Sequence, residues 1–177
     1  SILGEDRKLM VDANMNWTVE QAIEAANLMQ PYNVYWFEEP TIPEDIEGHI
    51  RIQKEGKIPI ATGENFHNVF EFQHFISSNA VSFPEPDVAT IGGITAWMKV
   101  AKMSEKANLP ITSHGVHDLH VHLLAAVPNS SMMEGDFWRL IAKHSVTSLS
   151  GVPYNYETPQ SDYKIKITSR TKKKESD

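Results

Sequence analysis

The chain has 177 residues, which is enough for one domain with a sizeable core or for a piece of a larger domain. Its formal net charge of −7 excludes a globally basic surface, so nucleic acid is not an expected partner. No apolar run reaches the roughly 18 residues of a membrane span, so no membrane is expected either. The absence of cysteine excludes disulfides and thiolate sites. With no signal-like N-terminus, we expect a cytoplasmic location.

Short apolar runs alternate with amphipathic stretches along most of the chain. The runs predict strands over residues 8–12, 34–38, 58–64, 80–87, 109–114 and 131–134. Between them, apolar stripes and capping residues predict helices over 18–29, 46–54, 69–77, 95–107 and 118–127. Thr18 and Gln21 have the spacing of a capping box, and Thr95 is the expected cap of the fourth helix. This alternation predicts a parallel sheet covered by helices.

Each predicted strand ends in an acid or a histidine, and these residues recur every 20 to 27 positions. That step fits one strand, one helix and two loops. In barrels of parallel strands, catalytic residues lie at these carboxyl ends. We therefore predict a partial (β/α)8 barrel of about six βα units over residues 1–150, corresponding to strands 3–8, with two strands preceding residue 1. Residues 151–177 lose the pattern and are predicted to form an irregular extension.

The first three strand ends carry Asp12, Glu38 and Glu64. Neighbouring strands lie about 4.8 Å apart, so these carboxylates can converge. Three mutual repulsions would cost on the order of 10 kcal/mol, which demands protons or a cation. Oxygen ligands favour Mg²⁺ over Mn²⁺ or Ca²⁺. The alternative is three separate surface acids. If the strand continues, Glu39 points to the opposite side, so it is expected to support a ligand or to form a salt bridge rather than to bind the metal.

The next three strand ends carry Asp87, His114 and Glu134. A carboxylate beside an imidazole fixes its tautomer and raises its basicity, so Asp87 and His114 are predicted to form a general-base pair. Glu134 is a candidate donor to a developing oxyanion, or else a surface acid. Asn14, two residues after Asp12, is a candidate for substrate contact, or else an ordinary loop cap. A zinc cluster of His114, His117, His120 and His122 is disfavoured, because His122 leaves the shared helix face.

These motifs resemble those of the enolase superfamily, specifically its mandelate racemase/muconate lactonizing branch. The matching stretches are VDANMNW, WFEEPT, ATGEN, PDVATIGGIT, SHG and HLLAAVPNSSMMEG, which together run from about residue 9 to 136. The resemblance implies that Asp12, Glu38 and Glu64 bind Mg²⁺, that Asp87 and His114 form the catalytic dyad, and that Glu134 hydrogen-bonds the intermediate. It also implies an N-terminal capping domain and a lysine-bearing strand, both missing from this sequence. Residue 85 is Glu where Gln is more usual.

The resemblance implies removal of the proton α to a carboxylate, with stabilisation of the enediolate. Dehydration of a sugar acid is the main hypothesis. Racemisation or epimerisation of an α-hydroxy acid is the closest alternative, and a catalytically inert chain that needs another polypeptide is a third. The expected partner is a small carboxylate, and the complete protein is expected to be a homo-oligomer.

Overall fold

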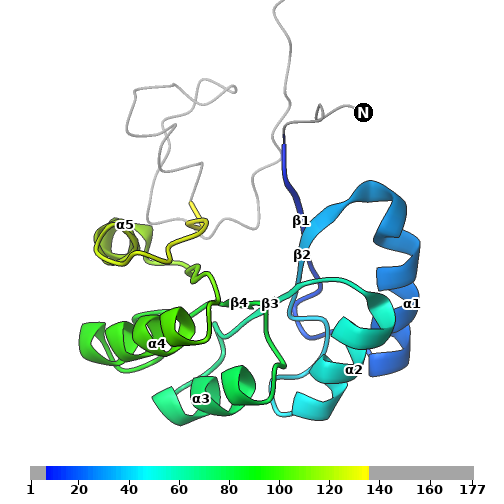
Figure 1. Cartoon of the computed structure of the whole chain (residues 1–177), viewed down its shortest axis with the longest axis horizontal. Helices are drawn as coiled ribbons and strands as arrows, with labels where there is room; N and C mark the ends of the chain where they lie inside the picture. The colour runs from blue at the N-terminus through cyan, green and yellow to red at the C-terminus, as the bar shows by residue number, and fades with distance from the viewer. Residues whose placement is uncertain (1–6, 136–177) are drawn as a thin grey trace, which may run out of the picture. The chain divides into compact units, whose positions relative to one another are not determined.

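The computed structural model describes residues 7–135, which alternate between strands and helices (Figure 1). The strands are β1 (Leu9–Asp12), β2 (Val34–Glu38), β3 (Ile60–Thr62) and β4 (Phe83–Pro84). The helices are α1 (Val19–Met29), η1 (Gln30–Tyr32), α2 (Ile46–Gly56), α3 (Val69–Ser77), α4 (Ile94–Lys106) and α5 (His117–Ala125). The predicted α/β class is confirmed. None of these helices has the length and apolar character needed to cross a bilayer.

The four strands form one parallel sheet in chain order, β1-β2-β3-β4. Beyond β4 the described residues form no further strand, and the next segments are joined by a few backbone hydrogen bonds. The Thr112 amide donates to the Pro84 carbonyl at 3.0 Å, and Ile111 forms an isolated parallel bridge with Ser130. The strands predicted over 109–114 and 131–134 are therefore wrong in extent, although both segments lie in the expected sheet order. Prolines such as Pro110 shorten the pairing because they donate no backbone hydrogen bond.

Local capping explains where the helices begin. Both hydrogen bonds of the capping box at Thr18 are present, which confirms that prediction. Helix α3 begins with a second capping box, at Asn68. Helix α4 instead begins after Gly93, whose φ of 102° is the left-handed conformation that glycine adopts without strain. Thr95 thus lies inside α4, and its predicted capping role is wrong.

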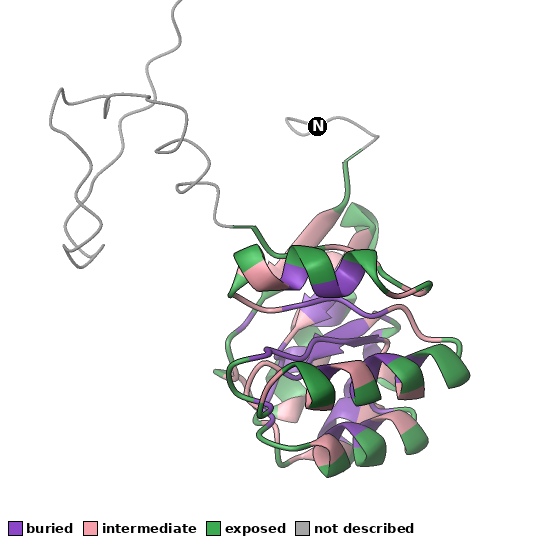
Figure 2. Ribbon diagram, turned by 90° about the vertical axis from the view of Figure 1, so that its left-hand side faces the viewer, coloured by how far each residue is buried: buried purple, intermediate pink, exposed green. Residues whose placement is uncertain are grey.

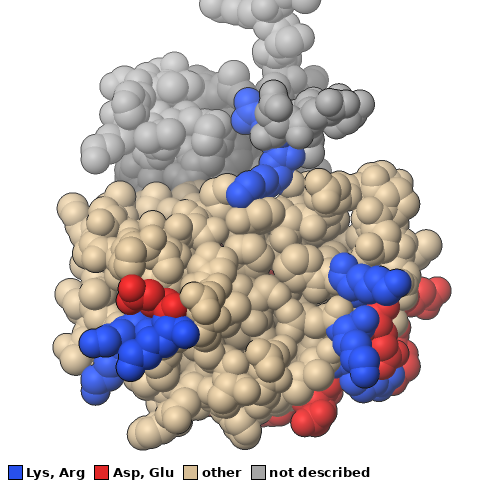
Figure 3. All heavy atoms as spheres, viewed as in Figure 1, with Lys and Arg blue, Asp and Glu red and all other residues tan. Residues whose placement is uncertain are grey.

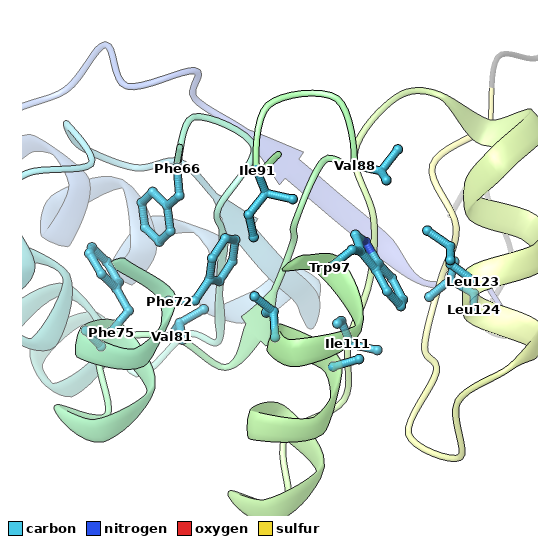
Figure 4. Close-up of a cluster of buried hydrophobic side chains, with 13 residues drawn as sticks. Phe66, Phe72, Phe75, Val81, Val88, Ile91, Trp97, Ile111, Leu123 and Leu124 are labelled. Atoms are coloured by element: carbon cyan, nitrogen blue, oxygen red, sulfur yellow. The ribbon is translucent and has the colours of Figure 1, made fainter. Parts of the chain in front are cut away.

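The buried residues lie mainly on the strands and on the sides of the helices that face them (Figure 2), and their apolar side chains form three clusters. A first cluster surrounds Phe37 of β2, against α1 and α2. A second cluster joins α3, α4 and α5, and Figure 4 shows Trp97 and the phenylalanine rings within it. Trp36, Ala61 and Phe83 form a third cluster, from strands β2, β3 and β4. Burial of apolar surface stabilises the fold by about 25 cal/mol per Å², so these clusters hold in place the strands whose ends carry the candidate site.

Charged side chains on the outside of the helices form local pairs. Arg51 of α2 contacts Glu20 of α1 at 3.1 Å and Glu55 at 3.0 Å. On the face drawn in Figure 3, lysine and arginine side chains form small separate groups, with acidic side chains beside some of them. Exposed pairs of this kind contribute little to stability, typically about 0.2 to 1 kcal/mol.

Candidate active site

The sheet brings the predicted residues to one edge because its strands are parallel. Asp12 and Glu38 end β1 and β2 and face each other in register, while Glu38 pairs with Ala61 of β3. Glu64 and Asp87 follow β3 and β4 within three residues. His114 follows the segment that hydrogen-bonds to β4. Four acids and one histidine that are far apart in the sequence thus lie at the carboxyl ends of neighbouring segments.

Asp87 and His114 form the predicted pair. His114 Nδ1 donates to Asp87 Oδ2 at 2.9 Å, and the other oxygen of Asp87 accepts from the Ala89 amide at 2.7 Å. This arrangement leaves Nε2 as the reactive nitrogen of His114. Nε2 lies 3.1 Å from Glu64 Oε2 and 3.9 Å from Glu134 Oε2. Burial lowers the pKa of His114, but the hydrogen bond with Asp87 and the nearby carboxylates outweigh it and raise the pKa overall.

The carboxylates of Asp12, Glu38 and Glu64 influence one another, but each has another partner. Asp12 accepts from the Asn14 amide at 2.7 Å, Glu38 accepts from Trp36 Nε1 at 3.0 Å, and Glu64 contacts His114. Within residues 7–135 no three acids or histidines are gathered closely enough to hold a metal ion. The predicted convergence of three carboxylates on one point is therefore not seen in this part of the chain.

The electrostatics of these acids nevertheless suit a cation. Burial, followed by the charges of Glu39, Glu38 and Asp12, raises the pKa of Glu64 to about 7, against a lowering influence of His114. Burial also raises the pKa of Glu38. A divalent ion would remove the repulsion that keeps protons on these groups. All three donors are carboxylate oxygens, which is the chemistry that Mg²⁺ prefers, so the residues fit this ion.

Glu39 is closer to the acid cluster than the sequence indicated. The strand ends at Glu38, and Glu39 has a left-handed φ of 39°. Its carboxylate is buried and accepts from Asn65 Nδ2 at 2.8 Å, while the same nitrogen lies 3.4 Å from Glu64 Oε1. Burial raises the pKa of Glu39. The expectation that it points away held only for a continuing strand, so Glu39 and Asn65 are site residues that strand periodicity missed.

Glu85 is a second acid that the sequence reasoning did not place in the site. It is 2% exposed, and its Oε2 has no hydrogen-bond partner in the part of the chain that the structure describes. Burial and then the neighbouring charge of Glu38 raise the pKa of Glu85 well above its usual value. A protonated Glu85 presents a neutral side chain at the position where the resembled family more often has Gln. That departure from the family pattern was the available signal.

The other candidates lie near the site but have different immediate partners. Glu134 accepts a hydrogen bond from the Gly115 amide, which holds it beside His114. Asn14 is exposed at the end of β1 with a left-handed φ of 45°, and its substrate contact stays a prediction. His120 is fully buried and uses both ring nitrogens in hydrogen bonds to backbone, so it has no nitrogen left for a metal. The zinc alternative is therefore not supported in the described residues.

The described residues form part of an α/β barrel, with carboxylates and a histidine–aspartate pair at the carboxyl ends of its parallel strands. The family model described as "Enolase C-terminal domain-like" matches residues 1–155, and the chain belongs to this family.

Three relatives illustrate the resemblance. A 3,6-anhydro-alpha-L-galactonate cycloisomerase of Streptomyces coelicolor is 50% identical over 132 residues, which cover 75% of this chain and 37% of the relative. A solved structure of a racemase from the same species, with bound magnesium, has a TM-score of 0.73 and 49% identity, covering 75% of this chain and 37% of that one. L-Talarate dehydratase from Polaromonas sp. JS666, complexed with Mg and L-glucarate, has a TM-score of 0.73 and 38% identity, covering 77% and 36%. The chain thus spans little more than a third of the length of these relatives.

Proposed function

We propose that this protein removes the proton α to the carboxylate of a sugar acid in a Mg²⁺-dependent reaction, and that loss of water follows. The supporting observation is the His114–Asp87 pair, in which Nε2 of His114 lies 3.1 Å from Glu64 Oε2, within the carboxylate cluster at the same edge of the sheet. Asp12, Glu38 and Glu64 would hold the ion. When bound, Mg²⁺ neutralises the substrate carboxylate and makes its α-proton more acidic. The relative complexed with Mg and L-glucarate supports both the ion and the class of substrate.

The chain's own residues supply the proton transfers. Nε2 of His114 takes the α-proton, and the electron pair of the C–H bond moves toward the carboxylate to give an enediolate. The resulting imidazolium is stabilised by Asp87. It can return the proton to the β-hydroxyl, whose C–O bond breaks as the carbon–carbon double bond forms and water leaves. The enol then tautomerises to a 2-keto-3-deoxy acid. Glu134, 3.9 Å from the same Nε2, is the candidate donor to the enediolate.

Isomerisation is the second candidate function, because the relatives with 50% and 49% identity are named a cycloisomerase and a racemase. It would begin with the same removal of the α-proton but would keep all atoms of the substrate. A homo-oligomeric state stays a prediction, which light scattering would test.

The test is incubation of the chain with Mg²⁺ and a panel of aldonic and aldaric acids in D₂O. A 2-keto-3-deoxy product with deuterium at C3, the carbon that takes up a solvent deuteron when the enol tautomerises, supports dehydration. Deuterium in a product of unchanged composition supports isomerisation. Absence of exchange with every acid, from a folded chain, would contradict both functions and favour a chain that is inert without another polypeptide.

A further inference from the structure

His120 lies between the two loops that carry the histidine–aspartate pair. Its Nε2 accepts a hydrogen bond from the amide of Val88, the residue after Asp87, at 3.1 Å. Its Nδ1 lies 2.7 Å from the carbonyl of Gly115, the residue after His114. One imidazole ring therefore connects the backbone that follows each member of the pair.

These two contacts fix the protonation pattern of the ring. An amide nitrogen can only donate, so Nε2 must be unprotonated. A carbonyl can only accept, so Nδ1 carries the proton. His120 is thus a neutral imidazole with a defined tautomer. Protonation of Nε2 would set two donors against each other inside the core, since His120 is fully buried.

Further contacts extend the connection on both sides. The Gly115 amide donates to Glu134, so the single peptide segment at Gly115 joins Glu134 to His120. On the other side, the Trp97 ring of α4 lies tilted beside the His120 ring, with 6.1 Å between centroids, and its Nε1 donates to the Pro86 carbonyl at 2.9 Å. Together these contacts connect the loops that carry Asp87, His114 and Glu134, the three residues predicted for proton transfer.

We propose that His120 is a positioning residue that clamps the Asp87 and His114 loops together. The need for a clamp follows from the fold. Between β4 and the segment before His114 the structure has no ladder within the described residues. The Thr112 amide donates to the Pro84 carbonyl, and this limited backbone pairing does not by itself fix the spacing of the two loops. A displacement of about 1 Å between reacting groups can cost on the order of a hundredfold in rate. The clamp stands on geometry, and only its kinetic test rests on the proposed function.

Two variants separate the halves of the clamp. In His120→Gln the longer amide reaches the position of Nε2, so its oxygen can still accept from the Val88 amide. In His120→Asn the shorter amide reaches only the position of Nδ1, so the Val88 amide loses its acceptor. The control is His49→Asn in α2. His49 is also a fully buried histidine, but its Nδ1 contacts only the Asp45 carbonyl of its own helix cap.

Amide hydrogen exchange of Val88, measured by NMR on the full chain, tests the clamp without activity. We expect slow exchange in the wild type, in His120→Gln and in His49→Asn, and exchange at least about tenfold faster in His120→Asn.

In the active protein, His120→Asn should lower kcat by about ten- to a hundredfold with KM changed less than about threefold, and His120→Gln should restore part of kcat. Unchanged Val88 exchange in His120→Asn would overturn the clamp. Equal kinetic losses in His120→Asn and His49→Asn would overturn the positioning role. A wild type without activity would contradict the proposed function while leaving the exchange result valid.

Discussion

Asp12 and Glu38 face each other at the end of a parallel ladder that is continuous from Met10, whereas Asp87 and His114 follow a strand of two residues and an isolated bridge. The first half of the site is held by backbone pairing and by the core around Phe37. The second half is held by hydrogen bonds between side chains and backbone, such as those that Asp87 accepts from Ala89 and His114. The difference shows that one sheet edge can carry a site whose two halves depend on different interactions. We call Asp12 and Glu38 the ladder half and Asp87 and His114 the dyad half, and we expect substitutions in the two halves to impair different properties, namely metal binding and proton transfer.

The largest expected effect is on the rate of α-proton exchange, in a variant of the dyad half. His114→Asn keeps a polar group at the position of Nδ1 but removes Nε2, the nitrogen that accepts the α-proton. General-base catalysis contributes about 10² to 10⁴ in rate, so α-proton exchange should fall by roughly 10³. The measurement is deuterium incorporation by NMR. His122→Asn, at an exposed position of α5, is the matched control and should keep wild-type exchange. Exchange by His114→Asn within about tenfold of the wild type would remove His114 as the base.

The ladder half is probed by Glu38→Gln, which removes a charge but keeps the shape. Loss of a carboxylate ligand should weaken Mg²⁺ binding by at least about tenfold, since even groups that only support ligands cost ten- to a hundredfold. Calorimetric titration of the chain measures this affinity. Glu55→Gln, in an exposed ion pair of α2, is the control and should bind Mg²⁺ like the wild type. Equal affinities in both variants would show that Glu38 is not a ligand.

The same division decides what could be predicted from the sequence. The bulky run at Val34–Glu38 predicts β2 to the residue, and the ends of β1 and β2 place Asp12 and Glu38 correctly. Periodicity fails where the backbone leaves the ladder. The left-handed turn at Glu39 puts a second acid into the site, although alternation predicts the opposite side. His120 was considered only as a zinc ligand, because no sequence pattern shows that a buried ring bonds to two distant loops. Proline and glycine positions predict where the ladder stops, but not which side chains replace it.

Glu64 connects the two halves and gives a pH-dependent test. Its pKa is raised to about 7 in the folded chain, so folding favours its protonated form. Its contribution to the free energy of unfolding is therefore greatest below the unfolded pKa and is lost as pH rises toward 7. For this partly buried group, we expect the metal-free wild type to lose on the order of 1 to 2 kcal/mol relative to Glu64→Gln between about pH 4.5 and 7.5.

Urea unfolding of both chains across this range measures the difference. Gln73→Ala, at an exposed position of α3, removes no ionisable group, so its free energy of unfolding should change with pH as in the wild type. Parallel pH profiles for the wild type and Glu64→Gln would mean that Glu64 is not held in a protonated state by its surroundings.

The last expected effect concerns a side-chain hydrogen bond that adds to the isolated bridge between the last two segments. Thr112 is buried, and its hydroxyl donates to the Met132 carbonyl at 2.6 Å. Thr112→Val keeps the volume and branching but leaves that carbonyl without this donor, which should lower the free energy of unfolding by about 1 to 2 kcal/mol. Thr95→Val, at an exposed position of α4, is the matched control and should change it by less than about 0.5 kcal/mol. If the dyad half depends on such bonds, Thr112→Val should also lower α-proton exchange while leaving Mg²⁺ affinity unchanged. If Thr112→Val lowers Mg²⁺ affinity by the same factor as α-proton exchange, the ladder half and the dyad half are held as one unit. The distinction between the two halves would then be wrong.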